Sequence, residues 1–387
     1  MITPVLESSR EPEAGWACRW CRSVDGTVVL DLGDQSAADD FPSEADPWPD
    51  AVHPLAMIQC QGCHLVQLES DPTSPDEPRG VEPMALRRQA SDAIDSIAAA
   101  GLLPPEGALL EHPSPHGGSW VGDLTARGLR EVDCGPADVV IDAFGMMHDP
   151  DQRTALQSRV DELGTDGVLF LQFHTLAAIV SQGMWNALRH GHFAYYSTPV
   201  LVNMAEELGL QAVGVWEFEL YGGTIMLAFG RGGHRSEQVN QLINEEVSAG
   251  VLDARVVSTL QEAVTDSVTQ IRHFLDSHLA AGRTIAGYGA ASRSVALLAI
   301  ARVRNTELLG IGDASPAKVG RCLPGGRIPV ISTRQLTDMR PDRVLLFVPD
   351  LLDEVRSALP QIEQHGGRWV VLDPEPVEIQ PVGATLS

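Results

Sequence analysis

Apolar and polar positions follow two alternating patterns over most of the chain, and these patterns predict strands and helices in turn. From Pro83 apolar residues recur at helical spacing, and the run Ala108-Leu109-Leu110 then predicts a buried strand that ends in a turn rich in glycine and proline. Further elements are predicted as a helix at 120–127, strands at 138–143 and 166–173, a helix at 197–208, and strands at 213–220 and 224–229. Strands that alternate with helices predict an α/β fold with a parallel sheet.

The last 150 or so residues predict a second α/β unit. Residues 236–279 have an almost continuous helical pattern, long enough to bridge two domains. A strand within 283–290 then runs into a glycine turn, and a helix follows from Ser292. Later strands are predicted at 308–312, 343–348 and 368–372, and the last fifteen residues are expected to form a tail.

The first 80 residues differ from the rest, because they are rich in Pro, Asp, Glu and Ser and contain only short apolar runs. Such a segment has too little core to fold without help, so a metal is expected to stabilise it. We therefore predict three parts: a zinc-binding domain at 1–82, an α/β domain at 83–235, and a C-terminal Rossmann-like α/β domain with its bridging helix at 236–387.

Four of the six cysteines form two Cys-x-x-Cys pairs, Cys18 with Cys21 and Cys60 with Cys63. This spacing lets two thiolates from one tight turn bind one edge of a tetrahedral Zn²⁺. Disulfides or unlinked buried thiols are the alternatives. Because no secretion signal follows Met1, we expect a reducing, cytoplasmic setting, where such pairs bind metal more often than they form disulfides. Four thiolates leave no open position, so the zinc is expected to be structural.

Composition narrows the classes of partner. Of the 387 residues 44% are hydrophobic, which suffices for ordinary cores, and no apolar run reaches the roughly 18 residues of a membrane helix. The net charge of −25, from 52 acidic against 27 basic residues, repels nucleic acid and anionic lipid. We expect a small-molecule substrate, and an anionic one would need a locally basic pocket.

Several short sequence motifs, in order along almost the whole chain, resemble those of the sugar C-methyltransferase family of deoxysugar biosynthesis. They are Cys60-x-x-Cys63-His-Leu-Val-Gln-Leu68, His190-Gly-His192-Phe-Ala-Tyr195-Tyr-Ser197, Gly222-Gly223-Thr224, Gly287-Tyr-Gly-Ala290, and Asp313-Ala-Ser-Pro-Ala-Lys318-Val-Gly320 with Leu323-Pro-Gly-Gly326. The resemblance implies a zinc-binding domain, a class I S-adenosylmethionine (SAM) methyltransferase domain, and a Rossmann-like domain that helps hold a nucleotide-sugar.

The cofactor turn departs from the family pattern Glu-x-Gly-Ser-x-x-Gly. Here the turn begins Glu111-His112-Pro113-Ser114 and ends at Gly117, so Pro113 replaces the first glycine, and Pro115 stiffens the same loop. By resemblance Glu111, Ser114 and Gly117 would contact SAM. Only ten residues separate Gly128 from the strand at Asp138. Either residues 129–133 form a shortened second strand with Asp133 on the ribose, or the adenosine pocket has been deleted.

The active-site words have also changed. The family's Tyr-His-Glu-His is Arg189-His190-Gly-His192 here, and the family pattern favours His192 as the base that removes a proton next to a ketone. In an extended loop His190 and His192 point to opposite sides, so one of them is expected to reach the substrate. Arg189 could bind an anion bidentately or could be a solvated residue at a helix end.

Further candidates lie at strand ends. His174 follows a predicted strand, where α/β sheets bind ligands, and Tyr221 offers a phenol for a substrate oxygen. In the C-terminal unit Gly287 and Gly289 open a helix after a strand, and Arg293 adds positive charge there. Asp313 ends the next strand. The resemblance implies a nucleotide or other phosphorylated handle at this turn; the alternative is a turn that serves only the architecture.

Three functions remain open from the sequence. The first is a SAM-dependent C-methyltransferase that acts on a keto-deoxysugar nucleotide. The second is a family member that has lost SAM and performs acid/base, elimination or substitution chemistry on an anionic intermediate of antibiotic or other specialised metabolism. The third is a silent subunit that activates a protein partner.

Overall fold

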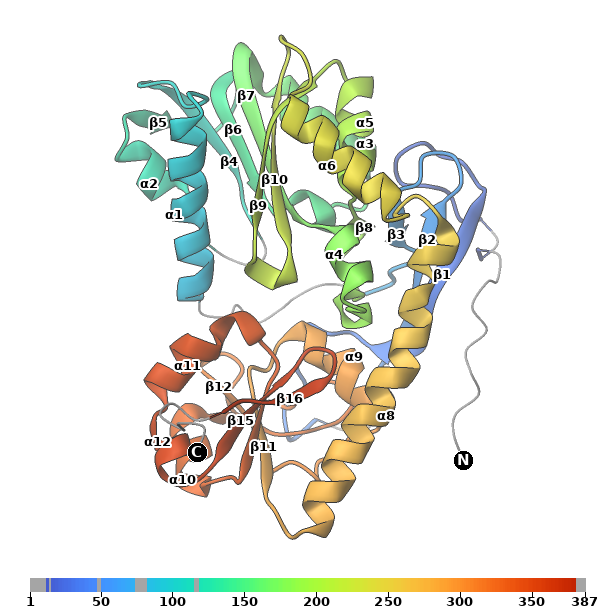
Figure 1. Ribbon diagram of the computed structural model, residues 1–387, viewed down its shortest axis with the longest axis vertical. Helices are drawn as coiled ribbons and strands as arrows, with labels where there is room; N and C mark the ends of the chain where they lie inside the picture. Colours follow the sequence, from blue (N-terminus) through green and yellow to red (C-terminus); the bar gives the residue numbers. More distant parts are fainter. Residues whose placement is uncertain (1–11, 14, 47–49, 74–81, 115–117, 381–387) are drawn as a thin grey trace.

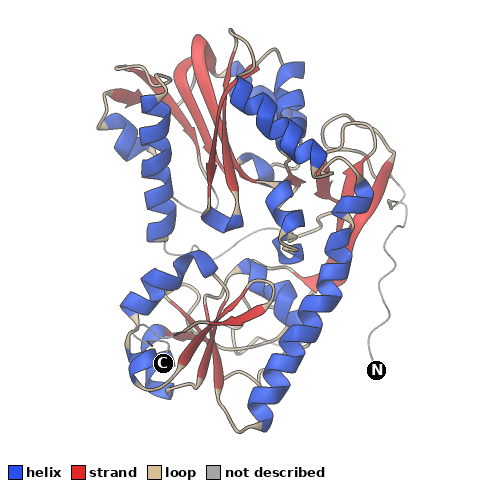
Figure 2. Ribbon diagram, viewed as in Figure 1, coloured by secondary structure: helices blue, strands red, loops and turns tan. Residues whose placement is uncertain are grey.

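The structure is a computed structural model that describes residues 12–13, 15–46, 50–73, 82–114 and 118–380. Its strands form three sheets, one for each part of the chain, and helices cover them (Figures 1 and 2). The sequence prediction of an α/β architecture with an N-terminal cysteine-bearing unit is confirmed. Among the described residues, no helix is both long enough and apolar enough to span a bilayer.

The N-terminal sheet is antiparallel and has the order β1-β2-β3-β8. Its strands are β1 (Gly26–Ser36), β2 (Val52–Cys60), β3 (Val66–Leu68) and β8 (Ala194–Tyr195). The last of these comes from the middle of the chain, where Tyr195 pairs with Val66. The cysteine-bearing unit is therefore joined by backbone hydrogen bonds to the segment that carries His190 and His192.

The central sheet has the order β5-β4-β6-β7-β10-β9, and β5, β4, β6 and β7 are parallel. Its strands are β4 (Gly107–His112), β5 (Leu129–Glu131), β6 (Ala137–Ala143), β7 (Leu163–His174), β9 (Gln211–Phe218) and β10 (Thr224–Gly230). Buried Val and Leu residues such as Val139, Val140 and Leu169 make these strands apolar on both faces, as a sheet covered by helices requires.

Helices on the central sheet begin mostly where the apolar pattern predicted them. They are α1 (Met84–Ala99), α2 (Val121–Thr125), α3 (Gln152–Asp161), α4 (Leu176–Ser181) and α5 (Thr198–Glu207), with 3₁₀ turns η1 (Met146–His148), η2 (Trp185–Ala187) and η3 (Leu220–Gly222). The Asp151 and Thr175 side chains cap α3 and α4 by accepting backbone hydrogen bonds.

The C-terminal sheet has the order β13-β12-β11-β14-β15-β16, parallel except for β16. Its strands are β11 (Ile285–Tyr288), β12 (Ile311–Asp313), β13 (Val330–Ser332), β14 (Arg343–Leu346), β15 (Arg368–Leu372) and β16 (Pro376–Glu378). Its helices are α9 (Ser292–Ile300), α10 (Thr333–Met339), α11 (Leu352–Ala358) and α12 (Gln361–Gln364), with a 3₁₀ turn η4 (Pro349–Leu351). The prediction that the last fifteen residues form only a tail was wrong, because β16 pairs with β15.

The prediction of one nearly continuous helix over 236–279 was also wrong. The segment forms α6 (Glu237–Ser248), α7 (Ala254–Val257) and α8 (Thr259–Ala280). The chain turns between α6 and α7 at Gly250, whose φ is +88°, a conformation that glycine adopts without strain. Helix α8 alone runs along one side of the molecule from the N-terminal sheet to the C-terminal sheet (Figure 1), and Gln261 bonds the backbone of Asp31 in β1.

Candidate functional site

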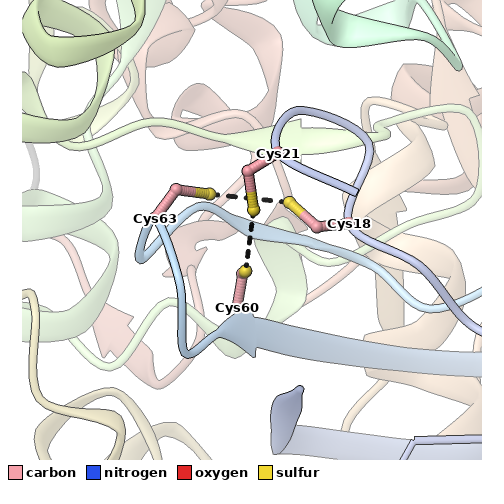
Figure 3. Close-up of side chains that lie close together, drawn as sticks. All are labelled: Cys18, Cys21, Cys60 and Cys63. Carbon is pink, nitrogen blue, oxygen red and sulfur yellow. Dashed lines mark hydrogen bonds between the residues drawn. The ribbon is translucent and has the colours of Figure 1, made fainter. Parts of the chain in front are cut away.

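The four cysteines of the N-terminal unit lie together, and their sulfur atoms are all within 4.8 Å of one another (Figure 3). Cys18 lies 3.5 Å from Cys63, and Cys21 lies 3.5 Å from Cys60. Sulfurs at about 2.3 Å from a tetrahedral Zn²⁺ are about 3.8 Å apart, so this donor set fits zinc. All four ligand positions would be filled by sulfur, which fits a structural metal.

The two Cys-x-x-Cys turns have the same backbone geometry. Arg22 donates its N–H to the carbonyl of Cys18, and His64 donates its N–H to the carbonyl of Cys60, at 3.1 and 3.0 Å. Both closing residues have positive φ, 64° and 60°. In each turn the N–H two residues after the first cysteine faces that cysteine's sulfur, at 3.4 and 3.3 Å. These donors stabilise thiolate charge, as a Zn²⁺ site needs.

Gln67 extends this support to the strand that follows the second turn. Its Nε2 donates to the Cys18 sulfur at 3.3 Å, and its Oε1 accepts from the Arg19 N–H at 2.8 Å. The pKa of Cys18 is lowered because Cys60 and Cys63 donate hydrogen bonds to it, with a further contribution from Gln67. Since β3 then pairs with β8, the metal unit positions the chain just after His192.

A cavity of about 200 Å³ lies where the carboxyl ends of the central and C-terminal sheets meet. Its wall includes residues that follow β6, β7, β11 and β14: Phe144, Met147, His174, Ser292, Arg293 and Asp350. The segment after η2 contributes Arg189, His192 and Tyr195. Ligands of open α/β sheets bind at such strand ends, so the two units offer one shared site.

Arg189 is buried, with its side chain 7% exposed, rather than solvated at a helix end. Its Nε donates to Nε2 of His192 at 2.7 Å, and a second guanidinium nitrogen bonds the hydroxyl of Ser292 at the start of α9. Its backbone N–H donates to the Tyr195 hydroxyl, which in turn donates to the Ala187 carbonyl. The guanidinium is therefore held inside the cavity wall.

The two histidines of this segment point to different surroundings. His192 lines the cavity, and its ring meets the His148 ring edge to face, with centroids 4.6 Å apart. His190 bonds the Pro54 carbonyl at 3.1 Å through its Nε2 and lies beside His53 instead. Burial, followed by the charge of Arg189, lowers the pKa of His148 to about 3, so His148 stays neutral.

His174 and Tyr221 face the same cavity. The Nε2 of His174 is buried and has no hydrogen-bond partner within the described part of the chain. Burial, followed by the charge of Arg293, lowers the pKa of His174 to about 3, so the ring is neutral. The Tyr221 ring lies between Phe144, at 5.6 Å, and the Arg293 guanidinium, at 5.6 Å. Burial raises the pKa of Tyr221, so the phenol remains a donor.

The loop that presents Tyr221 depends on a glycine. Tyr221 itself has a φ of +57°, and the chain then passes through Gly223 with a φ of +154°. A Cβ on Gly223 would lie 2.5 Å from the Cβ of Ala178, so a larger residue cannot fit there. The word Gly222-Gly223-Thr224 thus serves to bring a phenol to the cavity.

The C-terminal unit contributes a second guanidinium. Arg293 donates to the buried carboxylate of Asp373 at 2.6 Å, and the other oxygen of Asp373 accepts from Asn186 at 2.6 Å. Lys318 also lines the cavity, and its ammonium donates to the Ala290 carbonyl at 3.0 Å. Three cations therefore face a cavity in a protein of net charge −25. An anionic group would find there the basic pocket that the composition requires.

The glycine turn of this unit is built mainly by internal contacts. A Cβ on Gly287 would lie 2.7 Å from the Phe347 ring, and Gly289 has a φ of +85°. Asp313 accepts from the N–H groups of Ala290 and Ser315, at 2.8 and 2.7 Å. Asp313 thus holds the turn, whose next residues begin α9 and line the cavity.

The predicted cofactor edge, at the end of β4, is closed by hydrogen bonds. The two oxygens of Glu111 accept from the Ser119 hydroxyl at 2.5 Å and from the Trp120 N–H at 2.6 Å. The His112 ring bonds Glu162 at 2.6 Å. Ser114 follows in the described chain and is hydrogen-bonded or otherwise paired, whereas Gly117 and His116 lie outside the described residues.

Asp133 lies two residues beyond the end of β5. Strand β5 pairs with the first half of β4 and stops level with Leu109, and the chain then turns toward the amino end of β6 through Gly135 and Pro136. Asp133 is an exposed residue of that turn. In the described sheet β5 is the edge strand. No third strand of the described chain therefore lies beyond β5 to contact the adenine ring of a bound SAM.

A buried ion pair shapes the cavity loop after β6. Asp142 is 1% exposed and accepts from Nε and NH2 of Arg159 at 2.9 and 2.8 Å. The other oxygen of Asp142 accepts from the N–H groups of Gly145 and Met146. This pair fixes the loop that carries Phe144 and Met147 into the cavity wall.

Sequence reasoning missed several polar residues of the cavity. Asp350 and Asp373 follow the predicted strands at 343–348 and 368–372, so the strand-end rule that selected His174 could have found them. Asn186 lies in the η2 turn and carries no pattern that could have pointed to it. Asp39, beside Arg189, comes from a loop after β1 and is far from the site in sequence.

Two family models match the sequence. One is described as a C-methyltransferase C-terminal domain and matches residues 219–374, and the other is described as a zinc binding domain and matches residues 18–77. A curated relative, C-methyltransferase NovU of Streptomyces niveus, is 30% identical over 414 aligned residues, which cover 93% of this chain and 96% of NovU.

Similar solved structures include two methyltransferases with bound S-adenosylhomocysteine (SAH). Magnesium protoporphyrin IX methyltransferase from Synechocystis is 12% identical, with a TM-score of 0.28, over 38% of this chain and 84% of that chain. The N-methyltransferase NodS from Bradyrhizobium japonicum is 12% identical, with a TM-score of 0.29, over 38% and 88%. These scores are too low to support an inference about the present site.

Proposed function

The chain belongs to the C-methyltransferase family, and from this premise we propose that it acts on a carbon next to a ketone in an anionic small molecule, a keto-deoxysugar nucleotide or a similar intermediate. The observation that supports this substrate class best is the cavity, because it combines three cations with two histidines, His174 and His192, and the phenol of Tyr221. Acid/base catalysis on an anionic substrate needs cations to bind the anion and groups that accept or donate a proton.

In this proposal His192 removes the proton from the carbon next to the ketone. The C–H bond breaks, the proton moves to the imidazole, and the electron pair moves to the carbonyl oxygen as an enolate forms. Tyr221, protonated because burial raises its pKa, donates a hydrogen bond to that oxygen. Arg293, Lys318 and the first N–H groups of α9 hold the anionic handle.

SAM is the methyl donor that the family implies, and when bound it supplies an electrophilic methyl group. The predicted contacts Glu111 and Ser114 lie at the end of β4, but Glu111 already has protein partners and no further strand lies beyond β5 in the described sheet. We therefore expect SAM to bind in the micromolar range or more weakly. Titration calorimetry with SAM and SAH tests this expectation, and sub-micromolar affinity would contradict it.

A second candidate is an enzyme that uses the same cavity without SAM for elimination or substitution, acting alone or with a partner subunit. The closed β4 edge favours it, since Glu111 and His112 already have protein partners. Deuterium exchange at the substrate carbon in D₂O separates the two candidates. Exchange that requires no SAM, with no methylated product when SAM is added, would support the second.

The thiolate ligands also indicate the setting of the enzyme. Zinc binding requires the four cysteines to remain reduced, so we infer a reducing, cytoplasmic location. Metal analysis of protein purified without reducing agent tests the zinc assignment directly. One zinc per chain is expected, and disulfides in its place would contradict it.

A further inference from the structure

One side chain, Arg189, connects all three parts of the protein at the cavity. It bonds His192 in its own segment and Ser292 at the start of α9 in the C-terminal unit. Its NH1 also lies 3.6 Å from a carboxylate oxygen of Asp39, in the N-terminal unit. A substitution of Arg189 would therefore remove contacts to all three parts of the protein.

The contact with Arg189 determines the protonation of His192. A guanidinium has only N–H donors, so Nε2 of His192 must accept the hydrogen bond, which is 2.7 Å long. An imidazole that accepts at Nε2 carries its proton on Nδ1. The lone pair on Nε2 is thus covered by Arg189 and cannot take a proton from a substrate while this bond persists.

The charge of Arg189 is less well compensated than that of the other buried arginines. Asp39 is 3.6 Å away, beyond hydrogen-bond length, whereas Arg293 has Asp373 at 2.6 Å and Arg159 has Asp142 at 2.8 Å. A buried cation with a distant counter-charge gains strongly from a close anion. The planar fork of arginine can pair with two oxygens of a carboxylate or a phosphate at once.

The cavity wall beside Arg189 is arranged to receive such an anion. Helix α9 has nine residues and begins at Ser292, so its first N–H groups and its dipole face the same space. Independently, Asn186 is 2% exposed, lines the cavity, and has a buried Oδ1 that no described residue bonds. An unpaired buried acceptor in a cavity wall indicates that a ligand with a hydrogen-bond donor completes the site.

We propose that Arg189 is an anion-operated latch on His192, a proposal that rests on the proposed role of His192 as the base. Without ligand, Arg189 covers Nε2. When the oxyanion of a substrate enters between Arg189 and the start of α9, the guanidinium pairs with its oxygens and releases Nε2. The freed lone pair then accepts the proton from the substrate carbon, and the electron pair of the broken C–H bond moves to the carbonyl oxygen. Deprotonation is thereby coupled to correct seating of the anionic handle.

The latch can be observed without catalysis and without SAM, by NMR of the full chain labelled with ¹⁵N in its histidines. His192→Gln assigns the resonance. In the ligand-free protein Nδ1 should carry the proton, and Nε2 should show the upfield shift of a nitrogen that accepts a strong hydrogen bond. Saturating pyrophosphate should move the Nε2 signal downfield, toward an uncovered lone pair. Malonate, tested in parallel, distinguishes a carboxylate handle from a phosphate handle.

Variants sharpen the test. Arg189→Gln should give the uncovered signal without any anion and should weaken pyrophosphate binding by about tenfold or more. Arg293→Gln is the matched control, since it removes a cavity cation that does not contact His192, and should weaken binding while leaving the ligand-free Nε2 signal unchanged. Should Arg189→Gln not fold, the titration of the wild-type protein alone decides.

The proposal is overturned if neither pyrophosphate nor malonate moves the Nε2 signal, or if the ligand-free protein already shows an uncovered Nε2. These results concern the latch only. Absence of methyl transfer or of proton exchange with a responsive Nε2 signal would instead refute the proposed function and leave the latch standing.

Discussion

The end of β4 and the ends of β7 and β11 are comparable places in their sheets, yet their polar side chains are in opposite states. At the β4 edge Glu111 bonds Ser119 and Trp120, and His112 bonds Glu162. In the cavity, the Nε2 of His174 and the Oδ1 of Asn186 are buried without a partner in the described chain. Buried polar atoms normally have partners, so the second region has unmet hydrogen-bonding capacity that a ligand can fill.

The difference shows that family membership and site integrity are separate questions. The motif that departs most from the family pattern, at 111–117, is the one in which Glu111 and His112 already have protein partners. The motifs His190-Gly-His192 and Gly222-Gly223-Thr224 are closer to the pattern, and the cavity is lined by His192 and by Tyr221, which precedes Gly222. We infer that substrate handling has been kept more fully than cofactor handling.

The largest effect is expected from the zinc site, because it supports the cavity and not the β4 edge. Cys60→Ser should lower the free energy of unfolding by more than about 4 kcal/mol, since the unit has little core without metal. Hydrogen exchange should become faster in 188–197, where β8 pairs with β3, while 107–112 keep their protection. Chemical denaturation and exchange mass spectrometry measure both.

The matched control is Cys134→Ser, which changes an exposed cysteine outside the cluster. It should alter the unfolding free energy by less than about 0.5 kcal/mol. Equal exchange of 107–112 and 188–197 in the Cys60→Ser protein would break the comparison, because the metal would then support both regions alike.

The next effect concerns the cavity histidine. His192→Gln should reduce proton exchange or turnover about a hundredfold with little change in substrate affinity, as expected when a general base is removed. His190→Gln is the paired control, since His190 bonds the Pro54 carbonyl instead of lining the cavity, and its effect should stay within about fivefold. Wild-type rates for both variants would remove this segment from the chemistry.

Much of the fold was accessible from the sequence because it depends on local patterns. The structure contains the strands β4, β6, β7 and β14 where apolar runs predicted them. It also has helices that begin near Pro83 and at Ser292, as predicted. The failures have physical causes. The positive φ at Gly250 interrupts an otherwise helical pattern, and β16 is a three-residue edge strand too short to show a period.

The site was less accessible, because its contacts join residues far apart in the chain. The sequence selected Arg189 and His192, but it could not show that the guanidinium covers the imidazole or that Ser292 and Asp39 meet it. The sequence also offers Asp133 for the ribose, as the end of a shortened second strand at 129–133. Only the folded sheet reveals that β5 ends opposite Leu109 and that Asp133 follows in an exposed turn.

A smaller effect is expected from acid. Burial lowers the pKa of His174 to about 3, whereas an unfolded histidine titrates near 6.5. The unfolded state therefore binds a proton that the folded state does not, so stability falls as the pH drops below about 6.5 and continues to fall toward 3. Between pH 7 and pH 5 this histidine should cost about 2 kcal/mol.

His174→Gln should reduce that acid-dependent loss by about the same amount, as measured by urea unfolding at the two pH values. His112→Gln is the matched variant at the β4 edge. The His112 ring bonds Glu162, so this variant serves as the comparison for a histidine that already has a protein partner. If His174→Gln and His112→Gln reduce the acid-dependent loss of stability by the same amount, the two edges do not differ in how their histidines are held.

The smallest effect is expected at Asp133, and it tests the cofactor edge itself. If SAM binds over the end of β4, Asp133 should be irrelevant, because the residue is exposed in the turn that leads to the amino end of β6. Asp133→Asn should therefore change SAM or SAH affinity by less than about twofold, under about 0.4 kcal/mol, in titration calorimetry. Glu111→Gln, measured in parallel, should weaken SAM or SAH binding more than Asp133→Asn does. The reason is that the Glu111 carboxylate accepts a hydrogen bond from the Trp120 N–H and belongs to the turn that carries Ser114. A tenfold loss in Asp133→Asn would mean that the turn after β5 reaches the cofactor after all, and the β4 edge would then be a working SAM site rather than a closed one.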